Sequence, residues 1–292
     1  MTGPPHISRL ALPTPRSARR WRARRFVLTT AGLAVSALFI APYAVMLLDS
    51  LRPSGEVLQT PPGLLPGHWQ LTAYSNILGD TRFLHWLNTS LIIAFASTAI
   101  VLVAAIPAAY FTARYRFPGR RTFLFMVLIT QMFAPTSLVV GLYREFFEAN
   151  LINTYLAIVI TNAAFNLAFA VWIMHGFFAS LPKEVEEAAA LDGCGRARTL
   201  LQIMLPLTLP GVVTATIFTF IAAWNEYVVA LTLMQDDYKK PLTVGISSYV
   251  TGYDQIWNEL FAASVIAIVP VVVLFAVIER HLVGGLTAGS IK

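Results

Sequence analysis

The sequence is poor in charged residues and in cysteine. Only 12% of its 292 residues are charged and 57% are hydrophobic, whereas about 25% of the residues in soluble domains are charged. Cys194 is the single cysteine, which excludes an internal disulfide framework and any multi-cysteine metal or iron–sulfur site. Lipid rather than water must therefore be the solvent for most of the chain.

Motifs of the common catalytic and cofactor sites are also missing. The sequence has no G-x-x-x-x-G-K-[ST] phosphate-binding loop and no G-x-S-x-G nucleophile elbow. The five histidines have no metal-ligand spacing: His6, His68, His85, His175 and His281. We therefore expect no catalytic residue, no metal and no cofactor in this chain, and we do not expect an enzyme.

Long apolar runs are what the sequence does contain. A membrane-spanning helix needs about 20 mostly apolar residues. Six runs of that length occur, at residues 26–48, 86–112, 122–143, 155–178, 209–234 and 260–278. Their only ionisable residues are His175, near one end of the fourth run, and Glu226 in the fifth. The sequence predicts an all-α polytopic membrane protein with six transmembrane helices.

The basic residues predict the orientation of these helices. With a cytoplasmic N-terminus, 16 of the 21 Lys and Arg residues lie on the cytoplasmic side and five on the other. Lys and Arg accumulate in cytoplasmic loops, so we expect both termini in the cytoplasm. This distribution accounts for the net charge of +6 without nucleic-acid binding.

Residues 1–25 contain seven of the arginines and four prolines, which predicts a disordered, Arg-rich cytoplasmic tail. The alternative is a cleavable export signal, because Arg24-Arg25 precedes an apolar run. That run is longer than a signal's apolar region, and five more follow it. We therefore expect a retained first helix and one transmembrane domain over residues 26–292.

The loop at residues 179–208 lies on the predicted cytoplasmic side and has a helical composition. Ser180 is suited to an N-cap, and three glutamates follow near the positive end of the helix dipole. Gly193 is expected to end this first helix and Pro206 to stop a second one. The pattern predicts a helix–Gly–helix element at the membrane surface. It suits docking of a partner, although an amphipathic helix packed on the protein's own spans has the same composition.

The spacing within this loop resembles a known family signature. Glu187-Ala188-Ala189 is followed after three residues by Gly193, and after nine more by Ile203-x-Leu205-Pro206. This resembles the cytoplasmic loop of the permease subunits of binding-protein-dependent ABC importers. Asp192-Gly193 and Pro210-Gly211 are similar to the sugar-uptake branch of that family, of the maltose-transporter type. Cys194 stands where this branch has alanine.

The resemblance implies the ABC importer permease fold and a set of partners. The loop would be a coupling helix that docks on a separate ATPase subunit, which would bind the ATP and Mg²⁺. Two ATPase subunits, a second homologous permease and an extracytoplasmic substrate-binding protein are implied. The implied ATPase-docking residues are Glu187, Ala188, Ala189, Asp192, Gly193, Ile203, Leu205 and Pro206.

Polar residues at membrane depth are costly in lipid and are therefore candidates for a substrate path. Asn162 and Asn166 are one turn apart and should share a helix face. We expect Gln131 in the inner half of the third span, and Asn225 and Glu226 near the outer interface at the end of a continuous fifth span. Hydrogen bonds between helices are the alternative for these residues, and for Glu226 we favour a structural or gating bond.

The outer loop after the fifth span carries aromatic residues among polar ones. Such residues suit stacking on sugar rings, and they equally suit a membrane-interface belt or a protein contact. In the maltose-type family that the chain resembles, this region faces the binding protein, so the resemblance makes Tyr249, Tyr253 and Trp257 candidates for that contact. The resemblance implies a permease subunit of an ATP-driven importer that moves a sugar or related carbohydrate across a bacterial-type plasma membrane, and the six spans agree with it. A stand-alone secondary transporter or channel is the alternative, but it would favour ionisable residues in mid-membrane and an inverted repeat.

Overall fold

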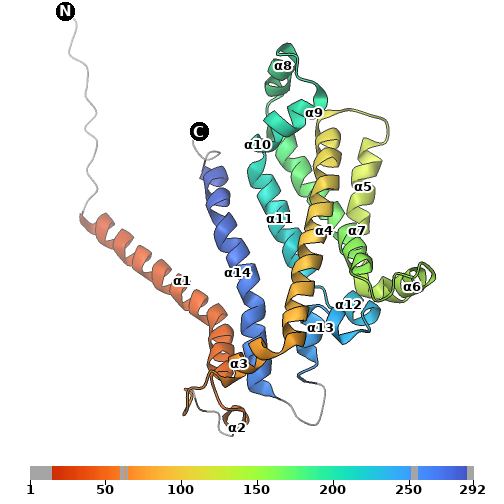
Figure 1. Ribbon diagram of the computed structural model, residues 1–292. Coiled ribbons are helices and arrows are strands. Elements are labelled where there is room, and N and C mark those ends of the chain that lie inside the picture. The colour runs from red at the N-terminus through yellow and green to blue at the C-terminus, as the bar shows by residue number, and fades with distance from the viewer. Residues whose placement is uncertain (1–14, 60–62, 64, 251–255, 288–292) are drawn as a thin grey trace, which may run out of the picture.

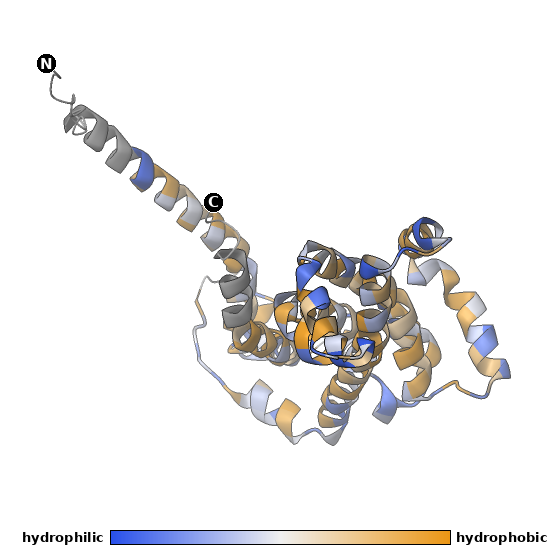
Figure 2. Cartoon of the chain, turned by 90° about the horizontal axis from the view of Figure 1, so that it is seen from above, coloured by the Kyte–Doolittle hydropathy of each residue, from blue (hydrophilic) through white to orange (hydrophobic). Residues whose placement is uncertain are grey.

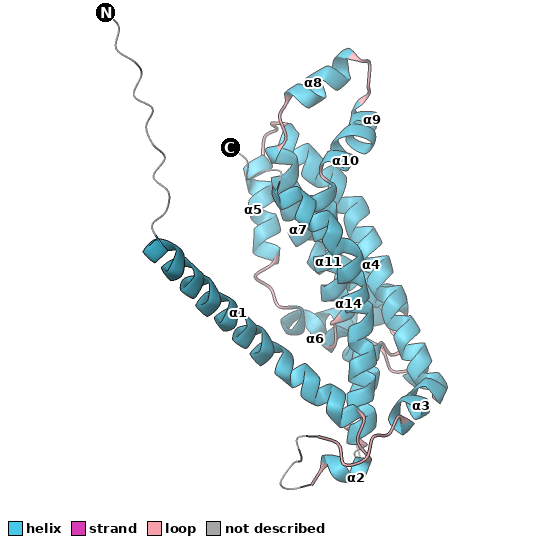
Figure 3. Ribbon diagram, turned by 90° about the vertical axis from the view of Figure 1, so that its left-hand side faces the viewer, coloured by secondary structure: helices cyan, strands magenta, loops and turns pink. Residues whose placement is uncertain are grey.

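The computed structural model describes residues 15–59, 63, 65–250 and 256–287, and all regular structure within these residues is helical (Figure 3). Four helices are long and apolar enough to cross a membrane. Two bent helix pairs raise the number to six if each pair forms one span. The predicted all-α polytopic fold is therefore confirmed.

The four continuous spans agree with the first, second, fourth and sixth apolar runs. They are α1 (Pro15–Ser50), α4 (Thr81–Arg114), α7 (Tyr155–Ser180) and α14 (Trp257–Thr287). Side chains cap two of their N-termini: Asp80 accepts a hydrogen bond from the Arg82 amide at 2.9 Å, and Thr154 accepts one from the Ala157 amide at 3.4 Å. These caps satisfy amides that the helix itself leaves unpaired.

The third span is broken, and our prediction of one helix over 122–143 was wrong. α5 (Arg120–Thr130) and α6 (Pro135–Glu148) meet at 94°. Proline at the first position of α6 has no amide hydrogen to donate, and it disfavours helical backbone in the residue before it. Ala134 accordingly has extended backbone, with φ −71° and ψ 132°. The sequence signal was present in Pro135, but the apolar run concealed it.

The fifth span also differs from the predicted continuous helix over 209–234. α11 (Leu209–Trp224) ends at Trp224, and a separate short helix, α12 (Val228–Leu233), follows. Before α11, a helix continues through residues 196–207 as α9 (Arg196–Arg198), a π-helical turn (Thr199–Met204) and α10 (Leu205–Leu207). The chain then bends by 81° at Thr208. The helix therefore passes through Pro206 and does not stop there as we predicted.

Short elements lie at the end of the bundle opposite α8 (Glu184–Leu191), as Figures 1 and 3 show. They are α2 (Ser54–Val57), α3 (Thr72–Gly79), a 3-10 turn (Asp237–Lys239) and α13 (Leu242–Ser247). We call these two ends of the molecule the α8 end and the α3 end. The C-terminal end of α14 points toward the α8 end, and so does the N-terminal end of α1 (Figure 1).

The core is built around α4, which packs along α7 and α11. Small residues on these helices are fully buried, among them Ala105, Ala170 and Ala215. Small side chains allow helix backbones to approach closely, which drives helix association where lipid offers no hydrophobic gain. Gly211 shows how close this approach is, because a Cβ there would lie 2.5 Å from the Phe177 ring.

α1 is set apart from the other helices. It contacts α14 near the α3 end and then diverges from the bundle, as the end-on view shows (Figure 2). Its apolar side chains are exposed, including Phe26 at 74% and Leu38 at 72%. The helix begins at Pro15 and not at Phe26, so part of the tail that we predicted to be disordered is helical. The rest of that tail, residues 1–14, lies outside the described residues.

Candidate functional site

The predicted coupling loop forms a helix–Gly–helix element at the α8 end. α8 ends in a Schellman motif, in which the Cys194 amide donates to the Ala189 carbonyl at 2.9 Å and the Gly193 amide donates to the Ala190 carbonyl at 3.1 Å. Gly193 has φ +77°, a left-handed conformation that glycine adopts without strain. The prediction that Gly193 ends the helix is confirmed. Ser180 is the last residue of α7 and not the N-cap of α8, which is Lys183.

α8 has one buried position and a broad exposed face. Ala189 is 3% exposed and packs on the protein itself, whereas Glu187, Ala188, Asp192 and Gly193 are exposed. Leu191 is 89% exposed, and it was not among the predicted docking residues. Together with the exposed Ala188 and Ala190 it forms an apolar surface on a helix beyond the end of the bundle, which is a candidate contact for another protein.

An ion pair holds this face in place. Arg114, the last residue of α4, lies with its Nε 3.1 Å from the Glu186 Oε1 atom. The Arg114 side chain is only 5% exposed and that of Glu186 is 23% exposed. Arg196 adds a second contact, with its guanidinium 5.1 Å from the centre of the Tyr115 ring. The position of α8 therefore depends directly on the end of α4.

The second helical stretch of the loop is less exposed than α8. Ile203 and Leu205 are half-buried, and Pro206 is exposed. Leu200 packs against the hydrophobic cluster formed by α4 and α7. Of the predicted docking residues, those in and just after α8 are accessible apart from Ala189, while Ile203 and Leu205 contribute partly to the protein's own packing.

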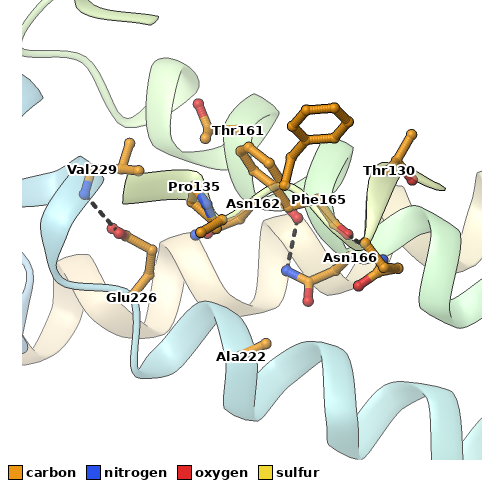
Figure 4. A pocket seen from close by; sticks show the side chains of 12 residues that line it. Thr130, Pro135, Thr161, Asn162, Phe165, Asn166, Ala222, Glu226 and Val229 are labelled. Atoms are coloured by element: carbon orange, nitrogen blue, oxygen red, sulfur yellow. Dashed lines mark hydrogen bonds between the residues drawn. The ribbon is translucent and has the colours of Figure 1, made fainter. Parts of the chain in front are cut away.

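A cavity of about 270 Å³ lies between the two broken spans and α7 (Figure 4). It is lined by Thr130, Gln131, Phe133, Ala134, Pro135, Thr161, Asn162, Phe165, Asn166, Ala222, Glu226 and Val229. Four of the five predicted path residues are among them: Gln131, Asn162, Asn166 and Glu226. We expected Gln131 in the inner half of the third span and Glu226 near the outer interface, and the break at 130–135 and the end of α11 place both residues on one cavity.

The three amides of the cavity differ in their hydrogen bonding. Asn166 Nδ2 donates to the Asn162 carbonyl at 2.8 Å, which confirms that the two residues share a face of α7. Gln131 Nε2 donates to the Phe165 carbonyl at 2.9 Å. Asn162 is 4% exposed, and its Nδ2 has no hydrogen-bond partner among the described residues. A buried donor left unpaired costs about 1–3 kcal/mol.

Glu226 combines a structural role with a place in the cavity wall. Its two carboxylate oxygens accept hydrogen bonds from the Val229 amide at 2.7 Å and the Ala230 amide at 2.9 Å, and so cap the start of α12. Its backbone carbonyl accepts a bond from Thr243 Oγ1 at 2.7 Å. Asn225 is exposed, caps the end of α11 and does not line the cavity.

The aromatic candidates at the α3 end take part mainly in internal packing. The Tyr249 ring meets the Trp86 ring edge-on at 6.2 Å, and burial raises the pKa of Tyr249 to about 12. The Trp257 ring lies 6.3 Å from the Phe261 ring, and its indole Nε1 is buried without a hydrogen-bond partner in the described part of the chain. Tyr253 lies outside the described residues. No group of three or more His, Cys, Asp or Glu side chains suited to a metal occurs within the described residues.

Comparison with known proteins identifies the family. Residues 105–287 match the model of the binding-protein-dependent transport system inner membrane component. The diacetylchitobiose uptake system permease protein NgcG of Streptomyces coelicolor is 33% identical over 273 residues, covering 92% of this chain and 90% of that protein. The trehalose/maltose transport system permease protein MalG of Thermococcus litoralis is 32% identical over 272 residues, covering 92% and 97%.

A solved structure supports the fold. One chain of a bacterial ABC transporter involved in the import of the acidic polysaccharide alginate superimposes with a TM-score of 0.75, covering 92% of this chain and 99% of that one, at 24% identity. The matched family segment begins in the last third of α4 and runs through the coupling loop and the cavity to the end of α14. The chain therefore belongs to the binding-protein-dependent transport system inner membrane components, the permease subunits of ABC importers.

Proposed function

We propose that this permease subunit imports a sugar or related carbohydrate into the cytoplasm by alternating access, driven by ATP hydrolysis in partner subunits. Relatives that match along most of their length are named for diacetylchitobiose and for trehalose and maltose. The cavity between α5, α6, α7 and α11 offers amide groups at membrane depth, where polar side chains are costly unless they have a role. Gln131, Asn162, Asn166 and Glu226 are the path residues that we assign to it.

The exposed face of α8 is the observation that carries the coupling part of the proposal. A permease that takes its energy from a separate ATPase needs a surface that transmits motion to its spans. α8 has such a surface in Glu187, Ala188 and Leu191, and the ion pair at Glu186 connects it to α4. One of the two expected ATPase subunits would dock here, and the two ATPase subunits would bind the ATP and Mg²⁺.

The α8 end is then the cytoplasmic end, and both termini are cytoplasmic. A second homologous permease would complete the translocation pathway. The α3 end would face the extracytoplasmic binding protein, with Tyr249, Tyr253 and Trp257 in or near the contact. Because Tyr249 and Trp257 are half-buried against neighbouring rings, we expect them to shape this surface rather than to supply most of its contact area.

Co-purification tests the docking surface. We expect the wild-type chain to co-purify with an ATPase encoded alongside it, and Leu191→Asp to lose that partner, because a charge would be buried in an apolar contact. Leu58→Asp is the matched control, since Leu58 is 66% exposed at the opposite end of the molecule. Glu187 and Gly193 variants should likewise uncouple ATP hydrolysis from uptake. Retention of the ATPase by Leu191→Asp and normal coupling in the Glu187 and Gly193 variants would refute the proposed role of α8.

A further inference from the structure

The cavity beside α7 has the composition of a small-molecule binding site, because a few polar groups lie among largely apolar walls. Small-molecule sites generally combine apolar and aromatic walls with a few placed polar groups. Here Phe133, Phe165 and Val229 supply apolar surface and three amides supply polarity. The volume of about 270 Å³ is at the small end for ligand pockets, so it suits one ring of a ligand rather than a long chain.

Asn162 is the group in this wall whose donor is unused. Its neighbours Gln131 and Asn166 donate to backbone carbonyls, so each is held by the protein itself. Asn162 Nδ2 is buried with no partner among the described residues, while the residue lines the cavity. A ligand hydroxyl would satisfy this donor, because a hydroxyl oxygen has two lone pairs.

The charge of the residues that line the cavity favours neutral over anionic hydroxyl-rich ligands. The residues that line the cavity include one acidic side chain, Glu226, and no Lys, Arg or His. The positive end of the α6 dipole is equivalent to only about half a charge. An anionic sugar would therefore enter a site at membrane depth without a basic partner and close to a carboxyl group, which is unfavourable.

We propose that this cavity binds a neutral carbohydrate unit during transport, with Asn162 Nδ2 donating to a ligand hydroxyl, and that it excludes acidic sugars. This inference rests on the proposed function, because it assigns the substrate class of the same path. It makes Asn162 a specificity-determining residue of this permease subunit and gives the chain its own part in selection, in addition to any selection made by a binding protein.

The test uses the complete importer, with its partner subunits and binding protein, reconstituted in proteoliposomes. The probes are maltose, trehalose and diacetylchitobiose as neutral disaccharides and digalacturonate as an acidic one. We expect uptake of at least one neutral sugar and none of digalacturonate. Asn162→Leu should lower uptake of the neutral sugar at least tenfold. Thr98→Val is the matched control and should stay within twofold, because Thr98 is buried in α4 and bonds only within its own helix in the described structure.

Monodeoxy analogues of the transported sugar separate ligand binding from a packing defect. In the wild type, removal of the hydroxyl that meets Asn162 should reduce uptake, and in Asn162→Leu the same removal should have no further effect, because both changes delete one interaction. A packing role for Asn162 would leave the wild-type pattern of deoxy analogues intact in the variant. If Asn162→Leu fails to assemble, Asn162→Ala removes the amide without added bulk and carries the same expectations.

The outcomes distinguish this inference from the proposed function. Uptake of a neutral sugar that is unchanged in Asn162→Leu, or preferential uptake of digalacturonate, would overturn the inference while leaving a carbohydrate importer in place. An assembled complex that hydrolyses ATP but transports none of the four sugars would contradict the proposed function, and the inference with it.

Discussion

The ion pair between Arg114 and Glu186 leads to the most quantitative prediction. Glu186→Gln removes the charge that faces Arg114, whose side chain is 5% exposed. At the observed 3.1 Å, two unit charges in a medium of effective dielectric constant about 20 attract by about 5 kcal/mol. Part of this attraction offsets the desolvation of the two groups, and breaking a buried pair typically costs about 3–5 kcal/mol. Since Glu186 is 23% exposed and water screens it, we expect a loss of about 2–3 kcal/mol.

The assay is thermal unfolding of the purified chain in detergent. An unfolding entropy of about 2.1 cal/mol/K per residue corresponds to about 0.6 kcal/mol/K for a chain of this length, so Tm should fall by about 4 °C. The control is Glu184→Gln on the same helix, because Glu184 is exposed. Its removal should shift Tm by about 1 °C or less, since it contributes mainly through the helix dipole.

The double variant Arg114→Met/Glu186→Leu distinguishes an ion pair from simple crowding at this position. Replacement of a buried pair by apolar residues of similar volume is often neutral, so the double variant should recover most of the stability lost in Glu186→Gln. A Glu186→Gln variant as stable as the wild type, or a double variant less stable than the single one, would refute the assignment of Arg114–Glu186 as the anchor of α8.

Two backbone predictions follow from the glycines and one from the break in the third span. Gly245→Ala should destabilise the chain by about 1–3 kcal/mol in thermal unfolding, because its Cβ would overlap the buried Trp86 ring. The control Gly176→Ala should be neutral or stabilising, because nothing in the described structure lies within 4 Å of a Cβ there. Equal shifts in the two variants would contradict this packing. Gly193→Ala, at φ +77°, should lower the free energy of unfolding by about 1–2 kcal/mol. It should also increase the hydrogen exchange of the α8 amides more than that of the α7 amides. Unchanged exchange would argue against the Schellman motif. Pro135→Ala should favour straightening of the α5–α6 break and so reduce the volume of the cavity. A polar thiol reagent should then label a cysteine placed at Ala222 more slowly. Faster or equal labelling would count against the role of Pro135.

Composition and apolar run length were sufficient to predict the fold class and four of the spans. These properties depend on the cost of exposing polar backbone to lipid, which any helix of about 20 apolar residues avoids. The end of α8 was also predictable, because only a left-handed residue completes a Schellman motif and Gly193 adopts that conformation readily. Local chemistry determines such features, so a sequence shows them directly.

The breaks in the third and fifth spans were not predicted, because the length of an apolar run does not show where the helix is interrupted. The backbone polar groups freed at such a break can be satisfied by neighbouring parts of the protein. Pro135 carried a signal that the apolar composition outweighed. The end of α11 at Trp224 had no comparable signal, since it depends on Glu226 supplying a cap to α12 through its side chain. The Arg114–Glu186 pair was equally hidden, because its partners are far apart in the sequence and meet only when α8 folds back on α4.

The two breaks are also why the cavity contains the polar residues that it does. Irregular backbone at membrane depth is tolerated only where protein buries it or where it lines a cavity. Here the turn between Thr130 and Pro135 and the turn at Glu226 border the same cavity. α7 crosses this level as a continuous helix and presents Asn162 and Asn166 to it. A scan for polar residues in continuous helices therefore assigned Gln131 and Glu226 to different depths of the membrane, whereas the structure places both on one cavity. The two breaks are the features that bring Gln131, Asn162 and Glu226 together at this cavity.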